Sequence, residues 1–220
     1  MNRFQGVYTA LITPFTDEDL LDEDGLRLLI QRQITAGVDG IVFLGTTGEV
    51  PTLTGKEKER IIAIAKNDCS QKASFIVGTG SYSTKKTVED TLAAEKAGAD
   101  GALIVTPYYN KPTQEGLFRH FKEITDATKL PIIIYNIAGR TGQNLQTDTL
   151  KRLMEIPSIV GIKEASGNIS QINDVIGLAR NYRPEFSVLS GDDALTFPLM
   201  ALGGNGVISV ISNILPKEVK

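Results

Sequence analysis

The chain has 220 residues, of which 41% are hydrophobic, and its formal net charge at pH 7 is −3. This length is enough to bury a sizeable core, so we expect one soluble domain spanning residues 1–220. Acidic and basic residues are interspersed, which excludes the basic patch that nucleic acid or an anionic membrane would require. The only cysteine, Cys69, cannot form an intrachain disulfide, and the N-terminus has no long apolar segment, so we expect a cytoplasmic protein.

Eight short apolar runs alternate with amphipathic stretches along the chain. The runs are rich in Val, Ile and Leu without polar alternation, which is typical of strands buried on both faces in a parallel sheet. Eight alternating units favour a closed (β/α)8 TIM barrel. An open doubly wound sheet is the alternative, but it would usually carry a glycine-rich loop after its first strand, and this chain has Ile12-Thr13-Pro14-Phe15 there. The predicted strands are 7–14, 40–45, 74–80, 101–107, 131–136, 159–165, 186–191 and 206–210.

The stretches between these runs have apolar residues three and four positions apart, as in Leu26, Leu29, Ile30 and Ile34. Glycines at 37, 98 and 203 follow three of them and predict helix ends. The chain stops soon after the eighth predicted strand, so we expect a barrel without its eighth helix. That barrel would expose the apolar outer faces of its first and eighth strands.

Lys163 lies inside the otherwise apolar run 159–165. Strand alternation places Ile159, Gly161 and Lys163 on one face and Val160 and Ile162 on the other, so we expect Lys163 to point into the barrel. Desolvation lowers the pKa of a buried amine and makes it a nucleophile for a carbonyl group. A structural lysine paired with Glu164 or Asp192 is an equally open interpretation from the strand alone.

Other polar residues follow the predicted strands, at the edge of a barrel where chemistry takes place. Tyr135 ends the neighbouring strand on its inward side, where its phenol can approach Lys163 and carry protons. Thr46 and Thr47, flanked by Gly45 and Gly48, offer hydroxyl and backbone N–H groups that suit a carboxylate. The alternatives are a tyrosine that only caps the end of its strand and a glycine turn that binds no ligand. Lysine, phenol and anion-binding turn together predict a site for a 2-oxo acid.

Seven motifs in order, GVYTALITPF, GTTGE, TPYYNKPTQEGL, YNIAGRTG, GIKEASG, SGDD and GGNGVISV, run the length of the chain. With them the sequence resembles the dihydrodipicolinate synthase family, within the N-acetylneuraminate lyase superfamily of class I aldolases. The family also has an eighth helix and a C-terminal helical domain, for which this sequence has no counterpart. The resemblance implies no metal and no organic cofactor, and it implies a homo-oligomer, a dimer or a tetramer.

The resemblance also implies roles for individual residues. Lys163 would form a Schiff base with pyruvate, and Tyr135, Thr47 and Tyr109 would relay protons, with Tyr109 serving the site of a neighbouring subunit. Thr46 and Thr47 would hold the pyruvate carboxylate, and Arg140 the carboxylate of L-aspartate 4-semialdehyde. Gly191 and Ile208 would contribute main-chain contacts around the lysine. The implied product is 4-hydroxy-tetrahydrodipicolinate, on the way to diaminopimelate and lysine.

The sequence departs from the family pattern in two places, the loop that carries Arg140 and the positions linked to inhibition by lysine. Ala138 stands where the family usually has proline, which should loosen the loop that presents Arg140. Gly55, Tyr82 and Lys86 stand where lysine-inhibited members have histidine, asparagine and glutamate, so we expect no inhibition by lysine. The sequence leaves open a sister aldolase acting on sialic acid or a sugar acid, and a truncated, non-catalytic barrel.

Overall fold

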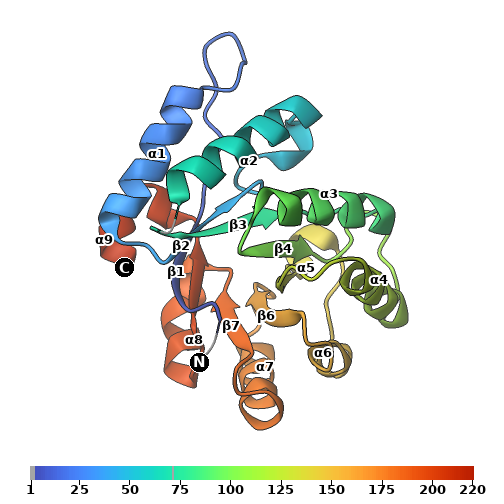
Figure 1. Cartoon of the computed structure of the whole chain (residues 1–220). Coiled ribbons are helices and arrows are strands. Elements are labelled where there is room, and N and C mark those ends of the chain that lie inside the picture. The colour runs from blue at the N-terminus through green and yellow to red at the C-terminus, as the bar shows by residue number, and fades with distance from the viewer. Residues whose placement is uncertain (1–2, 71) are drawn as a thin grey trace.

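A computed structural model describes residues 3–70 and 72–220. Eight parallel strands close into a barrel in the order β1 to β8, with β1 also paired to β8, and helices surround them (Figure 1). The predicted (β/α)8 barrel is therefore confirmed. The strands are β1 (Gly6–Ala10), β2 (Gly40–Phe43), β3 (Ser74–Gly78), β4 (Gly101–Val105), β5 (Ile132–Asn136), β6 (Ile159–Glu164), β7 (Ser187–Ser190) and β8 (Gly206–Ser209).

Local sequence signals explain where the helices begin and end. Thr54 and Glu57 form a reciprocal capping box at the start of α2, and Asp22, Ser83 and Asn168 cap other helices with their side chains. Glycines 37, 98 and 203 adopt left-handed conformations and end α1, α3 and α8, as predicted. The α-helices are α1 (Glu23–Ala36), α2 (Gly55–Cys69), α3 (Thr84–Ala97), α4 (Gln114–Ala127), α5 (Ala138–Thr141), α6 (Thr147–Met154), α7 (Ile169–Tyr182), α8 (Thr196–Leu202) and α9 (Pro216–Val219), and the 3-10 turns are η1 (Val50–Thr52), η2 (Asp193–Leu195) and η3 (Ile211–Asn213).

The core has two layers because strand residues alternate between the two sides of the barrel wall. Phe4, Tyr8, Val42, Ile76 and other inward side chains fill the interior. Outward side chains pack beneath the helices in a second, larger cluster. Most predicted strands extend past the observed ones at their carboxyl ends, so the residues in excess lie in the loops that surround the site.

The predicted alternation along β6 is wrong at its first two residues. Ile132 of β5 pairs with Ile159, but Ile133 pairs with Gly161, so Val160 is an additional residue in β6. This β-bulge turns Ile159 outward into the helix-facing cluster and Val160 toward the interior. The predicted alternation holds from Gly161 onward, so Lys163 still faces inward opposite Tyr135.

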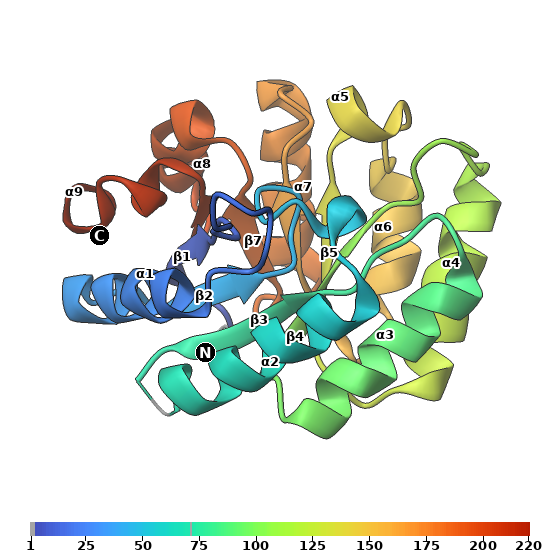
Figure 2. The same ribbon diagram turned by 90° about the horizontal axis from the view of Figure 1, so that it is seen from above.

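The expected exposure of β1 and β8 is also wrong. Val7 and Val207, on their outer faces, are 8% and 2% exposed. The buried Gln33 of α1 accepts a hydrogen bond from Thr9 and donates one to the carbonyl of Ser212, which draws η3 over the seam. After η3 comes the four-residue α9, which packs beside α1 (Figures 1 and 2).

Exposed apolar side chains lie instead on α8 and around η3, with Phe197 83% and Ile214 64% exposed. Across the described part of the chain, no helix is long and apolar enough to cross a membrane.

Candidate active site

Lys163 is 4% exposed on the inner face of β6. Its Nζ lies 4.2 Å from the centre of the Tyr135 ring, the residue opposite it in the register of β5 and β6. Burial lowers the pKa of the amine to about 8, with a smaller lowering from Arg140 and an opposing effect from the carboxylate of Asp193. A larger fraction of this amine is therefore unprotonated near neutral pH than of an ordinary lysine.

Neither carboxylate considered as a structural partner contacts this amine. Glu164 lies on the opposite face of β6 and accepts hydrogen bonds from Asn136 and from the backbone N–H of Ser166. Asp192 accepts from the backbone N–H of Ala194 at the start of η2. Among residues 3–70 and 72–220, Lys163 takes part in no ion pair, so the structure favours a nucleophilic amine over a structural one.

Tyr135 presents the face of its ring to the ammonium group, a cation–π arrangement. We expected the phenol itself to approach Lys163, but no hydrogen bond joins the two side chains in the described structure. The side chain is 6% exposed, and burial raises the pKa of the phenol to about 12. The phenol therefore keeps its proton at neutral pH and is able to donate it.

Thr46 and Thr47 lie in the tight turn after β2. The backbone N–H groups of Gly48 and Glu49 are bonded to the carbonyls of Gly45 and Thr46. Those of Thr46 and Thr47 donate to no described residue, so they are available to an anion. The positive φ of Glu49, 55°, closes the turn. The carboxylate site at this turn stays a prediction.

A cavity of about 220 Å³ opens at this end of the barrel. It is smaller than the ~300 Å³ typical of pockets for drug-sized ligands, which suits a small substrate. Thr46, Tyr135 and Arg140 are among its lining residues, whereas Lys163 and Thr47 are not. Lys163 lies behind this lining, in contact with the ring of Tyr135.

Arg140 projects from α5, a helix that the sequence did not predict, at the rim of the cavity. Its guanidinium lowers the pKa of both Lys163 and Tyr135, which places its positive charge within reach of the site. Asp193 is a residue that the sequence interpretation missed. Its carboxylate accepts from the backbone N–H groups of Val210 and Ile211 after β8, and it raises the pKa of Lys163.

Tyr109 does not join the other predicted residues. It is 89% exposed in the loop after β4, with a φ of 70°, and Lys111 also has a positive φ. A tyrosine with positive φ is uncommon and strained. The loop thus directs Tyr109 away from its own barrel, and its predicted contribution to a neighbouring subunit stays a prediction.

Of the two residues predicted to contribute main-chain contacts, Gly191 lies beside the lysine, and Ile208 lies in the barrel interior. Ile208 is fully buried among the interior side chains of the barrel. Gly191 follows β7, and its backbone N–H donates to the carbonyl of Glu164. A methyl group on Gly191 would lie 2.9 Å from Cε of Lys163, so only glycine leaves room for the extended lysine. In the described ranges, no group of three or more His, Cys, Asp or Glu residues is arranged to hold a metal ion.

A closed parallel barrel with a desolvated amine, a protonated phenol and unpaired N–H groups at its carboxyl edge defines a (β/α)8-barrel lyase. A family model described as the Dihydrodipicolinate synthetase family matches residues 3–220. The chain belongs to this family.

Known relatives resemble the chain over nearly its whole length. A curated 4-hydroxy-tetrahydrodipicolinate synthase of Protochlamydia amoebophila is 60% identical over 216 residues, which cover 98% of this chain and 72% of the relative. The crystal structure of dihydrodipicolinate synthase from Thermotoga maritima has a TM-score of 0.97 at 45% identity, covering 99% of this chain and 74% of that one. The crystal structure of the chloride-inhibited dihydrodipicolinate synthase from Acinetobacter baumannii, complexed with pyruvate, has a TM-score of 0.93 at 44% identity. The match covers 98% of this chain and 73% of that one.

Proposed function

We propose that this chain condenses pyruvate with L-aspartate 4-semialdehyde to give 4-hydroxy-tetrahydrodipicolinate. One observation carries the proposal: a buried lysine that has no ion-pair partner among the described residues, and whose amine lies against the ring of a protonated tyrosine. The names of the relatives and the pyruvate bound to the Acinetobacter baumannii enzyme support this choice of substrates.

The amine of Lys163 attacks C2 of pyruvate, and loss of water from the carbinolamine leaves an imine. Loss of a C3 proton gives the enamine, whose C3 adds to the aldehyde carbon of the semialdehyde, and the resulting alkoxide takes up a proton. The amino group of the semialdehyde then attacks C2 and displaces the lysine, which closes the ring.

Most of the predicted residues have a part in this reaction. The N–H groups of Thr46 and Thr47 bind the pyruvate carboxylate, and the fork of Arg140 binds the carboxylate of the semialdehyde. The phenol of Tyr135 donates a proton to the departing hydroxyl group, and Thr47 and a partner's tyrosine continue the relay. We propose a homo-oligomer in which the Tyr109 loop completes the neighbouring site, because that loop is exposed and strained in the single chain. The cytoplasm is the proposed compartment.

The first experiment is an intact mass measurement after incubation with pyruvate and borohydride. We expect a single reduced pyruvate adduct on the wild type and none on Lys163→Ala. A folded wild type without the adduct would refute the proposal and favour a non-catalytic barrel. An assay of the wild type with L-aspartate 4-semialdehyde and with N-acetylmannosamine then distinguishes the synthase from a sialic-acid aldolase.

A further inference from the structure

Two pairs of residues lie at consecutive positions where β5 meets β6. Tyr135 pairs with Lys163 on the inner face, and the next residues, Asn136 and Glu164, pair with each other on the outer face. Asn136 Nδ2 donates to Glu164 Oε2 over 3.1 Å, and the two residues are 0% and 1% exposed. The reacting pair is thus backed directly by a buried polar pair that the reaction sequence does not use.

The outer pair is the centre of a wider network. Asn136 also donates to Asn144 Oδ1 over 2.9 Å and accepts from the backbone N–H of Leu145 over 3.0 Å. Gln171, on α7, exchanges hydrogen bonds with Asn144 and donates to Glu164. These contacts fasten the ends of β5 and β6 to the segment that follows α5, the helix that carries Arg140.

An apolar residue would be the simpler choice at position 164, because Ile134 and Ile162 occupy neighbouring outward positions of the same strands. The carboxyl oxygens of Glu164 instead accept hydrogen bonds from N–H groups of Asn136, Ser166 and Gln171. Among the described side chains, no cation forms an ion pair with this carboxyl group. Burying such a group is costly, and buried polar networks can fix one arrangement among several.

We propose that Glu164 and Asn136 are positioning residues that hold Lys163 and Tyr135 at the separation required for imine formation. This inference rests on the proposed function, because it concerns the same amine and the same phenol. It adds that the outer face of the barrel wall determines the geometry of the inner face. The carboxylate subsite on the β2 turn lies outside this network, so it should bind pyruvate equally well without it.

The test is the rate of imine formation with pyruvate, measured by borohydride trapping. In Glu164→Gln the new amide directs an N–H group toward the donors Asn136 and Gln171. We expect the rate at saturating pyruvate to fall about tenfold or more, since small displacements of reacting groups have large effects. The pyruvate concentration at half saturation should stay within about twofold, because carboxylate binding is separate.

A double variant and a matched control separate positioning from general loosening. In Asn136→Asp combined with Glu164→Gln, the carboxylate at 136 accepts from the amide at 164, and we expect most of the rate to return. The control is Gln33→Met, which removes a fully buried amide on the far seam between β1 and β8. It should lower the midpoint of thermal unfolding while leaving the rate within about twofold of the wild type.

The outcomes are distinguishable. If the wild type forms no adduct, the proposed function fails. If it does and Glu164→Gln keeps the wild-type rate, or if Gln33→Met loses as much rate as Glu164→Gln, the inference is overturned. Should Glu164→Gln not fold, Gln171→Met removes one donor to Glu164 from a half-buried position, and about a threefold loss of rate is expected. An unchanged rate in that variant would also overturn the inference.

Discussion

A methyl group built on Gly191 would lie 2.9 Å from Cε and 3.0 Å from Cγ of Lys163. The backbone after β7 thus forms one wall of the space that holds the extended lysine. The lysine fills the space that a side chain at position 191 would otherwise take. The same methyl group would lie 2.8 Å from Cβ of Ala165, so a larger residue at 191 should displace both the nucleophile and the backbone that follows β6.

We therefore expect Gly191→Ala to reduce imine formation with pyruvate by about 100-fold, the order of effect that misplacing a reacting group produces. Its cost in stability should be about 1–3 kcal/mol, typical of a tight fit. Gly177→Ala on α7 is the matched control, because a methyl group there meets no atom within 4 Å. It should leave the rate unchanged and stabilise the helix slightly. Equal rates in the two variants would contradict the role assigned to Gly191.

The pH dependence of imine formation follows from the pKa of Lys163, about 8. The rate should rise about tenfold per pH unit below this value and level off above it, because only the free amine attacks. Arg140 lowers this pKa, so Arg140→Gln should move the midpoint to higher pH. Asp193 raises it, so Asp193→Asn should move the midpoint to lower pH. Borohydride trapping across the pH range measures both, and shifts in the opposite directions would refute the assigned charges.

Lys163 should also make the folded chain less stable. Burial lowers its pKa from 10.5 to about 8, so the folded state binds this proton less tightly than the unfolded state does. The penalty is complete below pH 8, shrinks as the pH rises from 8 to 10.5, and vanishes above. Lys163→Met should therefore gain about 3 kcal/mol at pH 7 and progressively less at higher pH. Urea unfolding of both proteins measures the difference, and a gain that grew with pH would be incompatible with a buried amine.

The sequence predicted the fold because each strand of a parallel barrel is a short, continuously apolar run. It also predicted the inward direction of Lys163. It could not reveal the bulge at Val160, because Ile159 and Val160 are both apolar and exchange faces without any change in the pattern. The bulge is visible only in the pairing of β6 with β5.

Polar contacts between residues far apart in the chain could not be predicted from the sequence either. Asp193 binds backbone N–H groups after β8, and Gln33 of α1 bridges β1 and η3, so neither role follows from neighbouring residues. Individual roles in the reaction could be assigned to residues only because the motifs resemble those of a known family. Composition and spacing alone led only to a lysine, a tyrosine and an anion-binding turn.

Ala138 is the first residue of α5, and its backbone N–H donates to no described residue. Proline is favoured at such a position, where it fixes φ without losing a hydrogen bond. Ala138→Pro should therefore stabilise the chain by about 0.5–1 kcal/mol and hold Arg140 more firmly. We expect the KM for the semialdehyde to fall while imine formation with pyruvate stays the same. A higher KM in steady-state assays would show that the loop needs its freedom.

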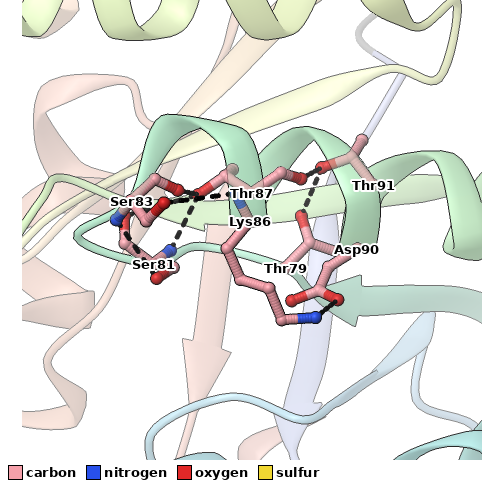
Figure 3. A network of polar contacts seen from close by, with 7 residues as sticks. All are labelled: Thr79, Ser81, Ser83, Lys86, Thr87, Asp90 and Thr91. Carbon is pink, nitrogen blue, oxygen red and sulfur yellow. Dashed lines mark hydrogen bonds and ion pairs between the residues drawn. The ribbon is translucent and has the colours of Figure 1, made fainter.

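A second cavity, of about 320 Å³, lies between α2 and α3, and it is lined by two of the positions from which we predicted insensitivity to lysine, Gly55 and Lys86. Gly55, Lys86 and Asp90 are among its lining residues, and Nζ of Lys86 lies 2.5 Å from Oδ1 of Asp90 (Figure 3). Asp90, one of the two acidic residues that line the cavity, is therefore already paired, and the charge of Lys86 repels an effector's ammonium group. We expect millimolar L-lysine to leave the initial rate unchanged, and a several-fold loss would contradict this prediction.

Reversing the charge at this position should create a cation site. In Lys86→Glu the new carboxylate lies on the same face of α3 as Asp90, so the pair would attract the ammonium group of lysine instead of repelling it. We expect L-lysine to raise the midpoint of thermal unfolding of this variant but not of the wild type, because a ligand stabilises the state that binds it. Lys85→Glu is the control: it makes the same charge change at an exposed neighbour outside the cavity lining. A lysine-dependent shift in both variants would indicate general charge attraction, and a shift in Lys86→Glu alone would locate the effect in the cavity.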